Sequence, residues 1–190
     1  MEARSKAKPR LDRRDWLDAA LAALVEGGIA AVTMEKLAAA LGVTRGSFYH
    51  HFRDRAELLD ELLDYWVSTW TVAVREDVAA LGLDPRSTLL ALMHTIAHRK
   101  AADHDVVFRA WALHDERARK VVSKVDVLRL EYIKSLFLAM GFEGLEAENR
   151  ARLSLYYEMA QPAMFDLPSE ELKGQLLVER HKLLTAGGDA

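Results

Sequence analysis

The sequence predicts an all-α protein with an N-terminal three-helix head and a C-terminal helical bundle, about nine helices in total. Ala, Leu, Glu, Arg and Lys dominate the 190 residues, and only four prolines occur. Apolar residues recur at helical spacing, whereas the alternation typical of β-strands is scarce. Hydrophobic residues make up 51% and charged residues 29% of the chain, which favours a packed core over disorder.

The composition also excludes several classes of protein. The chain contains no cysteine, so disulfides, cysteine-based zinc sites and thiol nucleophiles are excluded. No apolar run approaches the roughly 18 residues of a membrane span, and no apolar signal segment stands at the start. We therefore expect a cytoplasmic protein that does not contact membranes.

The net charge of −3 is unevenly distributed along the chain. Residues 1–55 contain ten Lys and Arg against seven Asp and Glu, a net of +3, and residues 56–190 contain sixteen against twenty-two, a net of −6. A basic head on an acidic body predicts a polyanionic partner for the head alone. A solvated basic tail is the alternative explanation of this pattern.

The head is predicted to contain three helices after a basic, flexible arm at residues 1–10. The first helix spans residues 12–26 and carries an apolar stripe. Thr33 caps a second helix over residues 34–41, which Gly42 ends in the left-handed conformation. A short third helix follows at about residues 44–49.

The body is predicted to contain the remaining helices. Asp54 caps a long fourth helix, with Glu57 completing a pair that resembles a capping box. Asp84 and Ser169 are further predicted N-caps. The later helices are expected at about residues 85–100, 104–113, 116–140 and 145–165, and after Ser169. This organisation predicts a DNA-binding domain at residues 1–55 and a ligand-binding and dimerisation domain at residues 56–190.

Two short helices joined at Gly42-Val43 have the arrangement of a helix-turn-helix. The second helix is too short to be stable alone, and it carries mostly hydrogen-bonding side chains, as expected for a helix that enters a major groove. Phe48 and Phe52 are predicted to be core residues instead. The predicted DNA-contacting residues are Thr33, Thr44, Arg45, Gly46, Ser47, Tyr49, His50, His51 and Arg55.

These residues have different predicted roles at the DNA. Arg45 can donate two hydrogen bonds to guanine, and Ser47 can reach a base or a phosphate. Gly46 removes a side chain and so permits close approach to DNA. Tyr49, His50, His51 and Arg55 are predicted to contact phosphates, which fix the register without reading sequence, and the helix N-terminus that Thr33 caps is a further phosphate site.

Three stretches of the head resemble the tetracycline-repressor (TetR) family of bacterial regulators. They are the Gly42-Val43 turn, Ser-Phe-Tyr-His-His-Phe at residues 47–52, and Asp-Arg-Ala-Glu-Leu-Leu at residues 54–59. The resemblance implies a nine-helix homodimer with its interface on the last two helices. It also implies a ligand cavity among helices four to seven and a hinge movement of the heads. His50 departs from the pattern, since many members carry an aromatic residue there.

Large apolar residues in the body predict an effector pocket with a few polar groups. The nominated lining residues are Trp66, Trp70, Met93, Phe108, Trp111 and Tyr132, which would suit a hydrophobic or aromatic small molecule. An ordinary core would contain the same residue types. His94 and His98 lie one helical turn apart, but exposed histidine pairs are common and we predict no metal and no cofactor. No catalytic motif occurs, so an enzyme is not expected.

The last two predicted helices carry apolar stripes that would be costly to expose to water. The predicted dimer-interface residues are Leu153, Tyr156, Tyr157, Met164, Leu172 and Leu176. Burial against a second copy would form an isologous four-helix interface, whereas the alternative is that both helices cover the core of one chain.

Taken together, these patterns predict a homodimeric transcriptional repressor that a small molecule releases from a palindromic operator. Two symmetric heads would read two half-sites of double-stranded DNA. Two alternatives stay open: a regulator of the same fold that binds DNA without a ligand, and a helical protein-interaction module.

Overall fold

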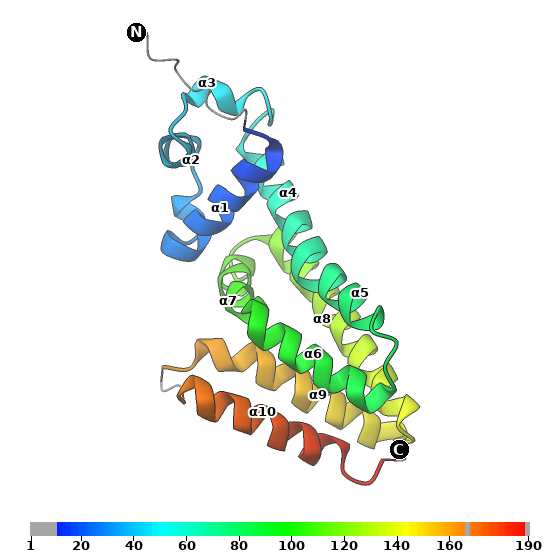
Figure 1. Cartoon of the computed structure of the whole chain (residues 1–190). Helices are drawn as coiled ribbons and strands as arrows, with labels where there is room; N and C mark the ends of the chain where they lie inside the picture. The colour runs from blue at the N-terminus through cyan, green and yellow to red at the C-terminus, as the bar shows by residue number, and fades with distance from the viewer. Residues whose placement is uncertain (1–10, 166–167, 189–190) are drawn as a thin grey trace, which may run out of the picture. The chain divides into compact units, whose positions relative to one another are not determined.

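A computed structural model describes residues 11–165 and 168–188 of the chain (Figure 1). The predicted arm at residues 1–10 lies outside these described residues. The described residues form helices and no strand, which confirms the all-α fold class. The chain divides into two compact units, Met1–Tyr65 and Trp66–Ala190. The boundary between the units lies within the helix Arg55–Val67, ten residues after the predicted boundary at residue 55, and the roles predicted for the two domains stay predictions.

The first unit contains α1 (Arg13–Gly27), a 3-10 turn (Ile29–Ala31), α2 (Met34–Leu41), α3 (Arg45–Phe48) and most of α4 (Arg55–Val67). The predicted caps are confirmed: the Thr33 side chain accepts a hydrogen bond from the Lys36 backbone N–H at 3.3 Å. Gly42 adopts the left-handed conformation at the end of α2, with φ 65°.

Aromatic side chains form the core of the first unit. Trp16 of α1 meets Phe48 edge-on, with ring centroids 5.4 Å apart, and Phe48 stacks on Phe52 at 5.3 Å. All three side chains are buried, which confirms Phe48 and Phe52 as core residues. Because α3 is one turn long, these contacts rather than its own hydrogen bonds hold it in place.

The second unit begins within the helix that leaves the first. After α4 the backbone continues as a π-helical segment (Ser68–Val72) and then as α5 (Ala73–Ala79), all without a break in helical dihedral angles. The predicted long fourth helix therefore exists, but its π-helical segment was not foreseen. The unit continues with α6 (Pro85–Arg99), α7 (Ala101–Ala112), α8 (Glu116–Ala139), α9 (Gly144–Ala160), a 3-10 turn (Gln161–Ala163) and α10 (Glu170–Thr185).

Two predicted helix boundaries differ from those of the structure. The predicted helix at 104–113 begins at Ala101, because Lys100 adopts a left-handed conformation with φ 51° and lets α7 follow α6 directly. The predicted helix at 145–165 ends at Ala160, where Pro162 follows in a 3-10 turn. Proline lacks the backbone N–H that a continuing α-helix needs.

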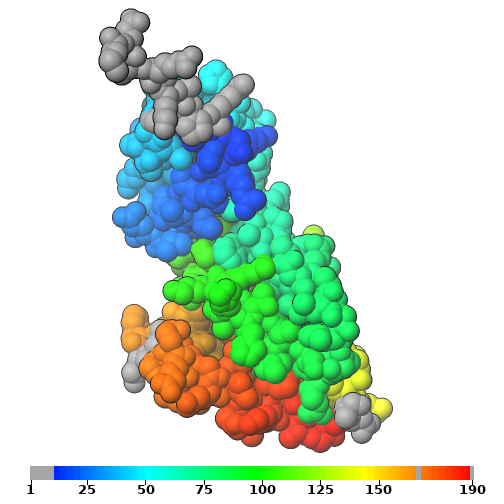
Figure 2. Space-filling view, viewed as in Figure 1, coloured from blue at the N-terminus to red at the C-terminus, as the bar shows by residue number. Residues whose placement is uncertain are grey.

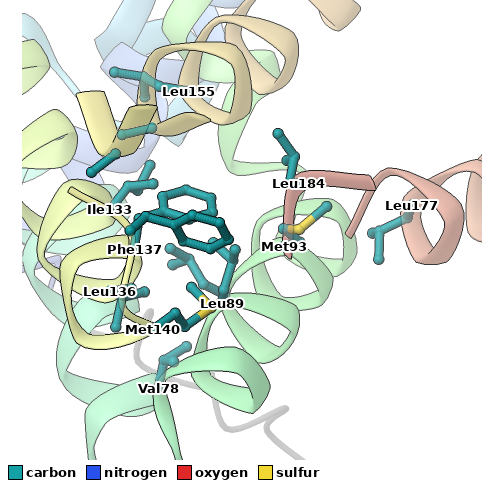
Figure 3. Close-up of a cluster of buried hydrophobic side chains, with 14 of the residues drawn as sticks. Val78, Leu89, Met93, Ile133, Leu136, Phe137, Met140, Leu155, Leu177 and Leu184 are labelled. Atoms are coloured by element: carbon teal, nitrogen blue, oxygen red, sulfur yellow. The ribbon is translucent and has the colours of Figure 1, made fainter. Parts of the chain in front are cut away.

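The core of the second unit is built from α5, α6, α8, α9 and α10. Phe137 of α8 lies at its centre among leucine and methionine side chains, with Leu155 of α9 and Leu184 of α10 at its margins (Figure 3). These side chains bury an apolar face of each helix, which is the main source of their stability. Within the described residues, no helix is both long and apolar enough to cross a membrane.

Candidate functional site

The helix-turn-helix of the first unit presents a polar surface formed by α3 and the residues next to it. Phe48 is buried in the core, so the opposite side of α3 faces outward. Thr33, Ser47 and His51 are half-buried. The remaining predicted contact residues of this surface are exposed: Thr44, Arg45, Gly46, Tyr49 and His50. The fold therefore brings the predicted base-reading residues together on one surface.

Arg45 is the cation at the centre of this surface. Its Nη1 lies 2.9 Å from Glu35 Oε1 on α2, and both side chains are more than half exposed. An exposed ion pair of this kind contributes roughly 0–1 kcal/mol, so Arg45 can exchange Glu35 for another acceptor at little cost.

Gly46 is not required by the fold. A Cβ built there would meet only Thr44 Oγ1, at 3.7 Å, which is an ordinary contact distance. Gly27 differs, because its Cβ would lie 2.9 Å from that of Ala31 and so prevent the close approach of α1 to the following turn. Gly46 therefore leaves space in which another molecule can approach the backbone closely.

Arg55 has an intramolecular role that the sequence analysis missed. Its Nε donates to the Val32 carbonyl oxygen at 2.6 Å and its Nη2 to the Ile29 carbonyl oxygen at 2.8 Å. These bonds tie the start of α4 to the segment before α2. The predicted phosphate contact of Arg55 stays a prediction.

The start of α4 is fixed by hydrogen bonds to two carboxylates. The Glu57 backbone N–H donates to Asp54 Oδ1 at 2.9 Å, and this bond lowers the pKa of the Asp54 carboxyl. Glu57 accepts from the Arg53 backbone N–H at 2.8 Å, which, with Arg13 beside it, lowers the pKa of the Glu57 carboxyl. The predicted capping pair is thus present, with Arg53 rather than Asp54 donating the second bond.

The second unit contains an apolar cavity of about 180 Å³ between α5, α6, α7, α8, α9 and the π-helical segment. Three of the six predicted ligand-binding residues line it: Trp70, Met93 and Tyr132. Trp66, Phe108 and Trp111 are buried and do not belong to its lining. Trp66 stacks on Phe108 with ring centroids 4.6 Å apart, so these two rings fill the core beside the cavity.

A buried ion pair in the cavity wall was not predicted from the sequence. Asp105 of α7 is 1% exposed and forms an ion pair with Arg129 of α8. The Trp66 indole Nε1 also donates a hydrogen bond to Asp105 Oδ1 at 3.2 Å. Arg129 also donates to Thr71 Oγ1, at 2.9 Å from Nη2, and to the Trp70 carbonyl oxygen at 3.4 Å. Both acceptors belong to the π-helical segment, so one arginine connects the cavity wall to that segment.

Two further residues of the lining carry polar groups. The Trp70 indole Nε1 is buried without a hydrogen-bond partner within the described structure, and its ring stacks on His104 with centroids 4.4 Å apart. Burial raises the pKa of the Tyr132 hydroxyl, and the nearby Arg75 charge opposes that shift. The cavity is therefore apolar with a few hydrogen-bonding groups, as effector sites usually are.

The described residues contain no group of three His, Cys, Asp or Glu side chains placed to hold a metal ion. His94 and His98 are both exposed on α6.

Apolar side chains are exposed on α9, on α10 and directly after α9, and α10 (orange to red) lies at the surface in Figure 2. All six predicted dimer-interface residues are exposed, from 38% for Tyr157 to 54% for Leu153 and Met164, the last of which follows the 3-10 turn after α9. Leu145 and Leu183 extend the same apolar surface and are 88% and 75% exposed. Arg180 of α10 lies over the Tyr157 ring of α9, 3.7 Å from its centroid, and so connects the two helices.

Comparisons with known proteins agree with this architecture. Residues 17–62 match the family described as bacterial regulatory proteins, tetR family. The HTH-type transcriptional repressor KstR2 of Rhodococcus jostii (strain RHA1) is 32% identical over 135 residues, which cover 71% of this chain and 64% of that protein. The chain thus spans less than two thirds of that repressor.

Two solved structures share the fold over most of both chains. The ketosteroid transcriptional regulator KstR2 of Mycobacterium tuberculosis superimposes with a TM-score of 0.67 at 18% identity, covering 100% of this chain and 97% of that one. AibR in complex with isovaleryl coenzyme A and operator DNA gives a TM-score of 0.71 at 16% identity, covering 91% and 97%. The helix-turn-helix at residues 17–62 is therefore that of bacterial regulatory proteins of the tetR family, and the two solved structures show the same fold for the chain as a whole.

Proposed function

We propose that the chain is a homodimeric transcriptional repressor that leaves a palindromic operator when a small molecule enters the cavity of the second unit. The observation that carries the proposal is the polar surface around α3. Most of its residues that can contact DNA are exposed and the others are half-buried, while Phe48 and Phe52 are buried. A one-turn helix that exposes Arg45, flanked by the exposed caps Thr44 and Tyr49, is suited to bind in a major groove.

The predicted DNA contacts fall into three physical roles in this proposal. Arg45 exchanges its exposed pair with Glu35 for the O6 and N7 atoms of guanine. Gly46 lets the backbone approach the DNA closely. Thr44, Tyr49, His50 and His51, with Thr33 at the N-terminus of α2, contact phosphates and fix the register.

The α9–α10 surface would supply the dimer. Exposed leucine and tyrosine side chains on two adjacent helices favour an isologous interface with a second copy. Two copies place two recognition helices on one duplex, which a palindrome matches. Such a protein acts in the cytoplasm, where bacterial DNA lies.

The effector site is the apolar cavity. Trp70, Met93 and Tyr132 would contact the ligand. Trp66, Phe108 and Trp111 would instead pack in the core beside the cavity. Thr71 and Trp70 belong to the π-helical segment of the helix that enters this unit, so occupancy can alter that helix. A ligand shifts the equilibrium only by its difference in affinity between the two forms. Two similar proteins support this mode of action: KstR2 is a transcriptional repressor, and AibR was solved in complex with isovaleryl coenzyme A and operator DNA.

Selection of bound duplexes from random DNA tests the proposal. The wild-type protein should enrich a palindrome, and Arg45→Ala should lose the preference at one position of each half-site, a cost of roughly 1–3 kcal/mol. Arg99→Ala is the matched control, since Arg99 lies on α6 of the second unit and pairs with Asp77. Equal selection by the wild type and Arg45→Ala would exclude the assigned role of Arg45.

The same selection separates the alternatives. Absence of any enriched sequence at low salt would overturn DNA reading and favour a protein-interaction module. Enrichment that no small molecule in a panel of hydrophobic and aromatic compounds reverses would favour a ligand-independent regulator.

A further inference from the structure

The wall of the apolar cavity reaches the protein surface at Arg75 of α5. Arg75 is exposed, whereas the other residues that line the cavity, all of them in the described part of the chain, are buried or half-buried. Much of the buried wall is apolar and includes Met93, Ile133 and Leu155, which come from three different helices (Figure 3). A molecule in the cavity would therefore meet apolar side chains inside and a cation at the outer edge.

The charges of this wall leave one cation without a partner. Asp105 forms its ion pair with Arg129, which also lines the cavity. Glu158 forms its ion pair with Arg180, which lies outside the lining. Arg75 forms no hydrogen bond or ion pair with any residue that the structure describes. Arg75 is thus the charged group of the lining that a ligand of opposite charge would pair with.

Tyr132 of α8 places a hydroxyl near this cation. Burial raises the pKa of the Tyr132 hydroxyl, and the Arg75 charge lowers it, so the two groups lie within electrostatic reach of each other. The hydroxyl, too, forms no hydrogen bond within the described residues. A guanidinium and a hydroxyl can both donate to one carboxylate, and arginine often binds a carboxylate through two parallel hydrogen bonds. The outer edge of the cavity is therefore suited to a carboxylate.

The volume of the cavity limits the rest of the ligand. An engineered apolar cavity of roughly 150 Å³ accommodates benzene. A volume of about 180 Å³ therefore suits one ring or a short branched chain, but not a fused-ring skeleton.

We propose that the effector is a small monocarboxylic acid, an inference that rests on the effector site of the proposed function. Its single ring or short branched chain fills the apolar cavity. Its carboxylate lies at the outer edge, where Arg75 and Tyr132 donate hydrogen bonds to it. A neutral compound of the same shape binds more weakly, because it lacks the charge that pairs with Arg75.

Isothermal titration without DNA tests this inference with benzoate, cyclohexanecarboxylate and 2-ethylbutanoate, each beside its primary amide. At least one acid should bind about tenfold or more tightly than its amide, because hydrogen bonds to a charged group are the stronger ones. Amides that bind as tightly as their acids would overturn the inference, and so would failure of all three acids to bind. 9-Anthracenecarboxylate, with three fused rings, should bind about tenfold or more weakly than the tightest of these acids. Equal or tighter binding of that compound would overturn the size limit.

Variants locate the carboxylate at Arg75. Arg75→Met keeps a long side chain at the edge of the cavity but removes the charge, so the preference for acid over amide should disappear while amide binding stays unchanged. Tyr132→Phe removes only the hydroxyl and should reduce the same preference. Arg119→Met is the matched control, since Arg119 is exposed on α8 and does not line the cavity. An equal preference for the acid in Arg75→Met and the wild type would overturn the assignment.

The two proposals fail in distinguishable ways. Operator selection uses none of these compounds. A selected palindrome without acid binding rejects only the carboxylic acid effector, whereas acid binding without any selected sequence rejects only the DNA-binding function.

Discussion

Removal of Arg129 should be among the most destabilising single changes in the second unit. Arg129→Met leaves the Asp105 carboxylate, 1% exposed, with the Trp66 indole N–H but without its charged partner. Stranding one member of a buried ion pair costs about 3–5 kcal/mol. The loss of the bonds to Thr71 and to the Trp70 carbonyl adds to the effect. Urea unfolding at one fixed protein concentration measures the change in free energy.

A second variant and a control identify the cause. Adding Asp105→Asn to Arg129→Met removes the stranded charge and keeps an oxygen for Trp66, so most of the lost stability should return. Arg99→Met removes an arginine whose pair with Asp77 is exposed, and it should cost about 1 kcal/mol or less. If Arg129→Met were no more destabilising than Arg99→Met, the assignment of a stability role to the buried pair would be wrong.

Three further predictions concern other features of the molecule. Gly46→Ala should leave the urea midpoint equal or higher but weaken operator binding in a gel-shift titration, whereas Gly27→Ala should destabilise, because its Cβ meets Ala31 at 2.9 Å. Burial raises the pKa of the Glu158 carboxyl above its ordinary value of 4.5, so the stability it contributes is present below that pH and is lost as the pH rises through the folded-state pKa. In Glu158→Gln the urea midpoint should depend less on pH above 4.5 than in the wild type. An equal pH dependence in the two proteins would contradict the role assigned to Glu158. Leu153→Glu should shift the proposed dimer to a monomer in sedimentation, unlike Leu113→Glu, which changes a leucine that is 72% exposed at the C-cap of α7, away from α9 and α10 in the sequence.

Local chemistry explains why the helix boundaries were largely predictable. Thr33, Asp54, Asp84 and Ser169 each accept a backbone hydrogen bond at a helix start, as their side chains predict. These bonds span three residues and depend little on the rest of the fold. Lys100 shows the limit of this reasoning, because a left-handed residue is usually glycine and nothing local indicates a lysine there.

The polar surface around α3 was also accessible from the sequence, because residue type separates its buried from its exposed residues. The aromatic side chains of Phe48 and Phe52 are buried, whereas Arg45 and Tyr49, which can form hydrogen bonds, are exposed. The role of Arg55 was not accessible in this way. Its acceptors, the carbonyl oxygens of Ile29 and Val32, lie more than twenty positions away in the sequence.

The cavity was only half predictable, since apolar residues that line a hollow and those that fill the core beside it have the same composition. Trp66 and Trp70 lie on successive turns of one helical run, yet Trp66 packs on Phe108 and Trp70 lines the cavity. Distinguishing them requires the positions of α7 and α8. Asp105 and Arg129 could have been noticed as charges within largely apolar helical stripes, but their pairing across 24 positions is a tertiary fact.

The π-helical segment connects these observations. Its sequence, Ser-Thr-Trp-Thr-Val, contains neither proline nor glycine, so no local breaker accounts for the change from α-helical to π-helical hydrogen bonding. The atoms that hold it come from elsewhere: Arg129 donates to Thr71 and to the Trp70 carbonyl oxygen. π-Helical turns are rare and concentrated at functional sites, where tertiary contacts maintain an arrangement that the helix alone would not choose. A ligand in the cavity would contact both Arg129 and this segment, since both line it. Such a ligand could therefore change contacts that support the π-helical form of the segment.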